Sequence, residues 1–172
     1  MSAGHPREST SSAYKSHVAR PYRKRIRLPV SGYADPDNVF HVTIRAAIGE
    51  VPFGNRTLGD QVWAELDYRR LAGSASVDAA CLMPDHLHIV ISLRSANVIS
   101  WVQAFKSFTT PMWWAAGRRG SLWQPSFYDV AIRTRAQDLA AVTYVANNAE
   151  AAGLVSTGTE WPWEGLWVES AG

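Results

Sequence analysis

The sequence predicts an α+β fold built on an antiparallel sheet, with two helices inserted between strands and a further helix near the C-terminus. Short alternating runs of β-branched and apolar residues indicate four strands, whereas longer runs with apolar residues three and four apart indicate helices. A chain of 172 residues with 47% hydrophobic and 19% charged residues has the size and composition of one globular domain.

The elements of the first half follow from local signals. The alternating runs predict strands over residues 39–47, 76–83 and 86–93. Between the first two strands, apolar residues near helical spacing predict a helix that Thr57 caps and Gly73 ends. The dipeptide Pro84-Asp85 predicts a tight turn between the second and third strands.

The second half supplies two more helices and one more strand. A helix is expected from about Asn97, and Pro111 either kinks it or begins a new one. A fourth strand lies within residues 122–134, and a third helix spans about residues 136–151. The aromatic tail WPWEGLW is expected to pack back onto the body, because so many apolar side chains would not remain in water.

The order strand, helix, strand, strand, helix, strand is that of a ferredoxin-like (RRM-like) antiparallel sheet, here extended by a C-terminal helix. In that topology the first and third strands are central neighbours. Residues 36–172 are therefore expected to form a single domain. Residues 1–35 are rich in Ser, Arg and Pro and lack periodicity, which predicts a flexible basic arm.

Composition limits the setting in which this protein works. The single cysteine, Cys81, lies in an apolar run, which predicts a core residue and no internal disulfide. No apolar run approaches the ~20 residues that span a membrane, and the N-terminus lacks the apolar centre of a signal peptide. We therefore expect a cytoplasmic, nucleoid-associated protein.

The net charge of +2 hides a strong asymmetry along the chain. Residues 1–30 carry seven Lys and Arg against one acid, and residues 94–135 carry six against one. After Arg135 there is no Lys or Arg, whereas five acids follow. Basic clusters beside aromatic residues are typical of a nucleic-acid partner, although a basic tail without a dedicated partner has the same composition.

The most informative motif is a pair of histidines, His86 and His88, inside the apolar run MPDHLHIVISL. Residues two apart on a strand point to the same face, so the two imidazoles stand side by side and could bind one metal ion. The alternative interpretation is a pair of hydrogen-bonded, half-buried histidines at a strand end.

A second pair lies on the predicted C-terminal helix. Tyr144 and Asn148 are four residues apart, which places them on one helix face. An asparagine inside a helix is unfavourable, but its amide oxygen can bind a hard metal ion, and a tyrosine hydroxyl can act as a nucleophile. Alone, Tyr144 would more often be a core aromatic residue; its pairing with Asn148 and with the histidines favours a nucleophile.

Several segments together resemble the single-tyrosine HUH transposases of the REP-associated and IS200-like type. These segments are FHVTIR, MPDHLHIV, WVQAFKSF, LWQPSFYDVAIR and YVANNAEAAGLV, and the closing WPWEG resembles the family's last aromatic segment. The resemblance spans most of the body. One departure is Ala149, where the family usually has a proline, and this residue is expected to let the helix run a turn further.

The resemblance implies a function. His86 and His88 would bind Mg²⁺ or Mn²⁺ with Asn148 as the third protein ligand. Tyr144 would attack a phosphodiester of single-stranded DNA near a hairpin, forming a 5′-phosphotyrosine link and releasing a 3′-hydroxyl. The enzyme would thus cleave and rejoin DNA, and a homodimer is possible because some relatives use the tyrosine helix of a second subunit.

The DNA is expected to lie along cations and aromatic faces. The candidate DNA-binding residues are Arg23, Lys24, Arg25, Lys106, Arg118 and Arg119. Lys106 matches a lysine of the family's second helix and could equally be a solvated residue on a helix face. At least half of the eight tryptophans should belong to the core.

Alternatives to this assignment stay open. Tyr128 is a second candidate nucleophile, although it lacks a ligand one helical turn away, and His41 could replace Asn148 as a metal ligand. The leading alternative function is a domesticated DNA hairpin-binding protein with weak or no transposition activity. An RNA-binding module would instead expose aromatic residues on the central strands, and a metallohydrolase would need more ligands.

Overall fold

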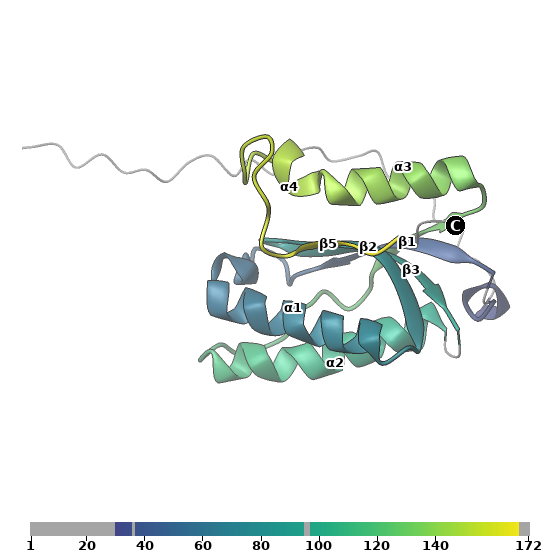
Figure 1. Ribbon diagram of the computed structural model, residues 1–172. Coiled ribbons are helices and arrows are strands. Elements are labelled where there is room, and N and C mark those ends of the chain that lie inside the picture. Colours follow the sequence, from purple (N-terminus) through teal and green to yellow (C-terminus); the bar gives the residue numbers. More distant parts are fainter. Residues whose placement is uncertain (1–29, 36, 95–96, 169–172) are drawn as a thin grey trace, which may run out of the picture.

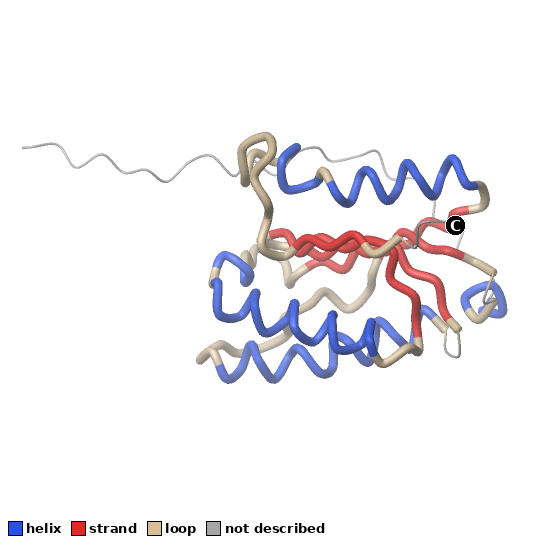
Figure 2. Tube along the Cα trace, viewed as in Figure 1, coloured by secondary structure: helices blue, strands red, loops and turns tan. Residues whose placement is uncertain are grey.

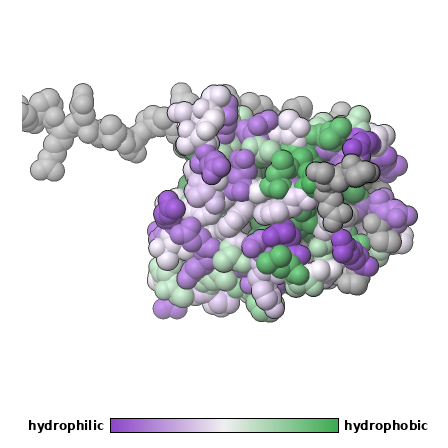
Figure 3. All heavy atoms as spheres, viewed as in Figure 1, coloured by the Kyte–Doolittle hydropathy of each residue, from purple (hydrophilic) through white to green (hydrophobic). Residues whose placement is uncertain are grey.

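The computed structural model describes residues 30–35, 37–94 and 97–168. One five-stranded sheet forms the middle layer, and its strand order is β4-β1-β3-β2-β5, with every neighbouring pair antiparallel. Helices α1 and α2 cover one face of the sheet, and α3 and α4 cover the other (Figures 1 and 2). The surface on the side viewed in Figure 3 mixes polar and apolar residues.

The observed elements agree with the predicted order. The strands are β1 (Val39–Arg45), β2 (Ala75–Met83), β3 (His86–Leu93), β4 (Tyr128–Ile132) and β5 (Glu164–Leu166). The helices are α1 (Arg56–Leu71), α2 (Val98–Ala115), α3 (Arg135–Ala146) and α4 (Asn148–Ala151), with 3₁₀ turns η1 (Val30–Tyr33) and η2 (Pro52–Gly54). Strands β1 and β3 pair at the centre of the sheet, which confirms the ferredoxin-like prediction.

In the layer formed by α1 and α2, one detail contradicts the prediction and another decides between two predicted alternatives. The cap of α1 is Asn55, whose side chain accepts a hydrogen bond from the Leu58 backbone N–H at 3.1 Å, and not Thr57. Pro111 lies inside α2, which continues to Ala115 without a new helix. Proline removes the bond to the carbonyl of residue 107, and both residues lie on the exposed side of the helix, where water can replace that bond.

The C-terminal helix is interrupted, and the prediction of one helix over residues 136–151 is wrong. Thr134 caps α3 by accepting a hydrogen bond from the Gln137 backbone N–H at 3.2 Å. The helix ends at Ala146, because Asn147 adopts φ −102° and ψ 6°, and α4 begins at the next residue. Asparagine competes with helical geometry through its short polar side chain, so two consecutive asparagines favour such a break.

Successive side chains of β1 point to opposite faces of the sheet, and each face has its own core. Phe40, Val42 and Ile44 are buried against α1 and α2 in the larger core. His41 faces the opposite layer together with the rest of the odd-numbered side chains of β1. Cys81 is buried in the smaller core beneath α3 and α4, which confirms its prediction as a core residue.

Both ends of the described chain pack onto the body. Trp163 is buried, donates from its indole Nε1 to Asp60 at 2.8 Å, and lies against Gly59, as predicted for the aromatic tail. Tyr33 stacks on Phe40 with ring centroids 5.5 Å apart, and its hydroxyl donates to Asp129 at 2.8 Å. Residues 30–35 therefore adjoin the body instead of extending the predicted arm, whose remaining residues, 1–29, lie outside the described residues.

Among the described helices, none is long and apolar enough to cross a bilayer. Four of the eight tryptophans are buried in the core, as expected, and Trp114 is the most exposed of the others at 54%.

Candidate active site

The two central strands present a cluster of polar rings on the face of the sheet that α3 covers. His86 and His88 share this face of β3, as the spacing predicts, because the alternate residues Leu87 and Ile89 fill the larger core. His41 joins them from the neighbouring strand β1. The histidines therefore replace apolar packing residues over the middle of the sheet.

The geometry of His86 and His88 suits one divalent ion. Their Nε2 atoms lie 3.0 Å apart, and the ring planes are perpendicular. Two ligands at right angles around an ion with bonds of about 2.1 Å would have their nitrogens about 3 Å apart. Within the described residues, no three His, Cys, Asp or Glu side chains converge on one point. The remaining ligands would have to be amide, phosphate or water oxygens.

Asp85 fixes the orientation of the first histidine. Its Oδ1 lies 2.6 Å from Nδ1 of His86. A carboxylate only accepts hydrogen bonds, so the imidazole donates from Nδ1, and in the neutral ring this leaves the lone pair of Nε2 directed at His88. Histidine ligands in metal sites are commonly held in this way by a carboxylate behind the ring.

The second histidine is oriented from β1. Nδ1 of His88 lies 3.1 Å from Nε2 of His41 and 3.1 Å from the hydroxyl of Thr43. Donation from Nδ1 to either partner leaves the lone pair of Nε2 directed at His86. Burial, and next the neighbouring His86, His41 and Arg45, lower the pKa of His88 to about 2. The ring is therefore neutral at physiological pH, as a metal ligand must be.

This arrangement also locates His41, the alternative third ligand. Its Nε2 contacts Nδ1 of His88, whereas Nε2 of His88 faces His86. An ion held between the two Nε2 atoms would thus lie on the other side of the His88 ring from His41. In this geometry, His41 orients the ligand His88 and is not itself directed at the ion.

Tyr144 reaches the cluster from α3. Its ring centroid lies 5.6 Å from that of His41 and 5.5 Å from that of His88, the latter in an edge-on arrangement. The residue is 49% exposed, so one side of the ring packs on the histidines while the other remains open. The helix that carries Tyr144 packs on the sheet of its own chain (Figure 1).

Asn148 lies beyond the helix break and is 9% exposed. The backbone N–H of the next residue, Ala149, hydrogen-bonds the Cys81 thiol, and Cys81 is the register partner of His88. The segment that carries Asn148 therefore lies over β2, beside the histidines. Its side chain makes no hydrogen bond to the described residues.

Tyr128, the alternative nucleophile, lies on the same face. It is the β4 register partner of Thr43, and it is 50% exposed. It is thus one strand further from His88 than Thr43, whereas Tyr144 packs directly on that ring.

Lys106 lies on the other side of the sheet, where it holds a loop. Its ammonium donates to the carbonyls of Gln124 at 2.8 Å and Ser126 at 2.9 Å, just before β4. Burial lowers its pKa to about 8. The described contacts of Lys106 are therefore structural, and a phosphate would have to compete with these carbonyls.

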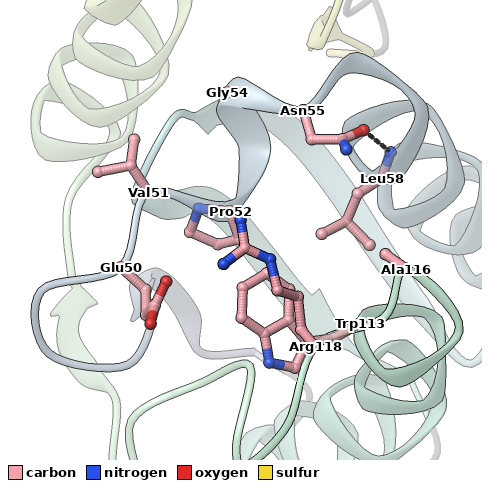
Figure 4. A pocket seen from close by; sticks show the side chains of 9 residues that line it. All are labelled: Glu50, Val51, Pro52, Gly54, Asn55, Leu58, Trp113, Ala116 and Arg118. Atoms are coloured by element: carbon pink, nitrogen blue, oxygen red, sulfur yellow. Dashed lines mark hydrogen bonds between the residues drawn. The ribbon is translucent and has the colours of Figure 1, made fainter.

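Arg118 lines a pocket of about 300 Å³ between η2 and the end of α2 (Figure 4). Its guanidinium carbon lies 5.3 Å from the ring centroid of the buried Trp113, with Glu50 across the pocket. The neighbouring Arg119 is exposed. Candidates Arg23, Lys24 and Arg25 lie outside the described residues.

Three residues that surround the histidine pair had no predicted role in the site: Asp85, Thr43 and Arg45. The first contacts His86, the second contacts His88, and the third is the register partner of His86. The alternation of FHVTIR already places Thr43 and Arg45 on the face of His41. That signal could have identified them.

Comparison with known proteins agrees with this fold and motif arrangement. The family described as "Transposase IS200 like" matches residues 67–148, a span that includes both histidines of β3, Tyr144 and Asn148. No curated protein matches the chain.

One solved structure shares this fold, and a second has a weaker similarity. A REP-associated tyrosine transposase bound to a REP hairpin is 19% identical, with a TM-score of 0.66 over 83% of this chain and 82% of that chain. A putative transposase from Deinococcus radiodurans R1 is 16% identical, with a TM-score of 0.47 over 73% of this chain and 96% of that chain. The resemblance read from the sequence is confirmed by the IS200-like transposase family model over residues 67–148.

Proposed function

We propose that this protein is a metal-dependent endonuclease and strand transferase for single-stranded DNA, with Tyr144 as its nucleophile. The match to the IS200-like family supports an enzyme that acts on DNA. The observation that carries the finer proposal is the packing of Tyr144 against His41 and His88. A half-exposed hydroxyl-bearing ring beside two convergent imidazole nitrogens is an arrangement suited to attack on a bound phosphate.

In the proposed step, the Tyr144 oxygen attacks the phosphorus of a phosphodiester. The phenolic proton passes to solvent, the bond from phosphorus to the 3′-oxygen breaks, and the 3′-oxygen takes up a proton to become a hydroxyl. The product is a 5′-phosphotyrosine. Attack by a 3′-hydroxyl on this link reverses the step and joins DNA without an external energy source, because the phosphoester bond is conserved.

The groups that would hold a divalent ion are His86, His88 and Asn148. Their nitrogen and amide donors, with DNA and water oxygens, suit Mn²⁺ or Mg²⁺. When bound, such an ion supplies positive charge to a phosphate oxygen. The protein residues meanwhile keep the His88 imidazole neutral and direct both imidazoles at one point, and α3 sets the position of the tyrosine.

We propose a hairpin-forming DNA as the substrate. This is supported by the relative of the same fold whose solved structure is bound to a REP hairpin. The seven Lys and Arg residues among residues 1–29 support an added electrostatic contribution to affinity.

Changing Arg23, Lys24 and Arg25 together to alanine should weaken DNA binding and reduce its salt dependence.

Covalent trapping tests the proposed function. The protein is incubated with Mn²⁺ or Mg²⁺ and a labelled single-stranded oligonucleotide that folds into a REP-type hairpin with flanking tails, and the products are resolved on denaturing gels. A protein–DNA band is expected for the wild type and for Tyr128→Phe but not for Tyr144→Phe. Hairpin binding by the wild type without any covalent band would instead favour the hairpin-binding alternative.

The variant His86→Ala separates chemistry from binding. It should lose the covalent band because an ion ligand is removed. Binding of the same oligonucleotide in EDTA should remain close to the wild-type value, since the proposed basic contacts lie elsewhere. Equal loss of binding and cleavage would contradict the assigned role of His86.

A further inference from the structure

Arg45 is the last residue of β1, on the strand face that carries His41 and Thr43. Its Cα is the register partner of His86 across the β1–β3 pair. The other two side chains of this face are engaged with Nδ1 of His88. Arg45 thus places a permanent positive charge at the rim of the histidine pair.

Arg45 differs from the arginines of α1 in its environment. Arg69 and Arg70 pair with carboxylates of their own helix at 2.6 and 2.7 Å. Arg45 is exposed, and its side chain makes no ion pair or hydrogen bond within the described part of the chain. Five N–H donors therefore remain available beside the site.

A phosphodiester under attack needs charge stabilisation on more than one side. Two non-bridging oxygens share the negative charge, which grows around phosphorus as the nucleophile approaches. The histidines hold one convergent point for an ion, so they address one side of the phosphate. A guanidinium fork matches the geometry of a phosphate and stays charged at all relevant pH values.

We propose that Arg45 is a catalytic residue that binds a non-bridging oxygen of the scissile phosphate and stabilises the charge that develops during attack by Tyr144. This inference rests on the proposed function and deepens it by assigning a second phosphate-binding group, distinct from the histidine pair. Arg45 acts on the DNA directly and contributes no metal ligand.

Substitution gives the first test. Arg45→Ala should slow formation of the covalent band about 10²- to 10³-fold, the usual effect of removing one donor to a developing oxyanion. Arg45→Lys keeps the charge but loses the forked guanidinium, so its rate should lie between those of the wild type and Arg45→Ala. The matched control is Arg56→Ala: that arginine begins α1, its side chain is 76% exposed and its pairing with Asp60 is long at 3.8 Å. The control should retain the wild-type rate.

A charge-neutral substrate distinguishes a phosphate contact from a structural effect. After the wild type has located the cleaved bond in the hairpin oligonucleotide, a methylphosphonate is placed there as each of its two diastereomers. For the diastereomer that lacks the oxygen bound by Arg45, Arg45→Ala and the wild type should react at similar rates. An equal defect on both diastereomers and on the natural phosphate would overturn the assignment, as would a wild-type rate for Arg45→Ala.

Binding measured without metal separates this inference from the proposed function. In EDTA, Arg45→Ala should bind the hairpin oligonucleotide several-fold more weakly. The negative slope of the log of the binding constant against the log of the salt concentration should become shallower by about 0.7. Arg56→Ala should change neither value. If the wild type forms no covalent band, the proposed function fails and the catalytic role of Arg45 fails with it, while a reduced slope would retain the phosphate contact alone. An unchanged slope with an intact wild-type band would reject Arg45 only.

Discussion

The hydrogen bond between Asp85 and His86 gives a quantitative prediction about metal affinity. The Oδ1–Nδ1 distance is 2.6 Å, short for a charge-assisted bond, and the two side chains are only 23% and 13% exposed. Removing a carboxylate behind a histidine ligand typically weakens metal binding 10- to 100-fold, or about 1.4–2.7 kcal/mol. Asp85→Asn retains a hydrogen-bond acceptor without the charge, so its loss of metal affinity should be about 10-fold. The loss for Asp85→Ala should be about 100-fold.

The assay is a titration of the metal-free protein with Mn²⁺, in which the electron paramagnetic resonance signal reports free ion. The control is Asp67→Ala on α1, a carboxylate that pairs with Arg70 at 2.7 Å and does not contact the histidines. His86→Ala should bind more weakly than either Asp85 variant. The same dissociation constant for the wild type, Asp85→Asn and Asp85→Ala would refute the argument that this carboxylate orients the ring.

Three further predictions concern the fold around the site. Alanine at Gly59 would normally stabilise a helix by about 1 kcal/mol, but its Cβ would overlap the Trp163 ring. Gly59→Ala should therefore cost about 1–3 kcal/mol in urea unfolding, and the sign should reverse in a Trp163→Leu background. His88 has a folded-state pKa of about 2 against about 6.5 when unfolded, so the unfolded state binds more protons below pH 6.5. In EDTA, the unfolding free energy should therefore fall by up to about 1.4 kcal/mol per pH unit below pH 6.5. His88→Gln should lack this part of the pH dependence, and identical pH profiles for the wild type and His88→Gln would be contrary evidence. Burial raises the pKa of the Cys81 thiol to about 12, so an aromatic disulfide reagent at pH 8 should label it only after unfolding, and rapid labelling of the native protein would count against this core.

The sequence predicts the sheet and the histidine pair well, because both follow from a two-residue period. In β3, the period that sends Leu87 and Ile89 into the core also sends His86 and His88 to the opposite face. The same rule applied to β1 would have placed Thr43 and Arg45 beside them. These residues escaped notice because a strand pattern gives the face of a side chain but not its neighbour across the sheet.

The features that were not predictable from the sequence depend on contacts between distant segments. The break at Asn147 combines its own backbone preference with the packing of the following residues on β2. Strand β5 has only three residues and gives no periodic signal, and it forms because the tail pairs with β2. Lys106 could not be assigned from spacing, because its partners are carbonyls 18 and 20 residues away.

The most direct test of the central claim is the identity of the tyrosine that carries DNA. Trypsin separates the candidates, because Tyr144 is the sole tyrosine of the peptide that follows Arg135, and Tyr128 is the sole tyrosine between Arg119 and Arg133. Mass spectrometry of the trapped adduct, after nuclease trimming, should find the added nucleotide mass on the peptide that contains Tyr144. The same mass on the Tyr128 peptide would contradict the assignment of the nucleophile to α3.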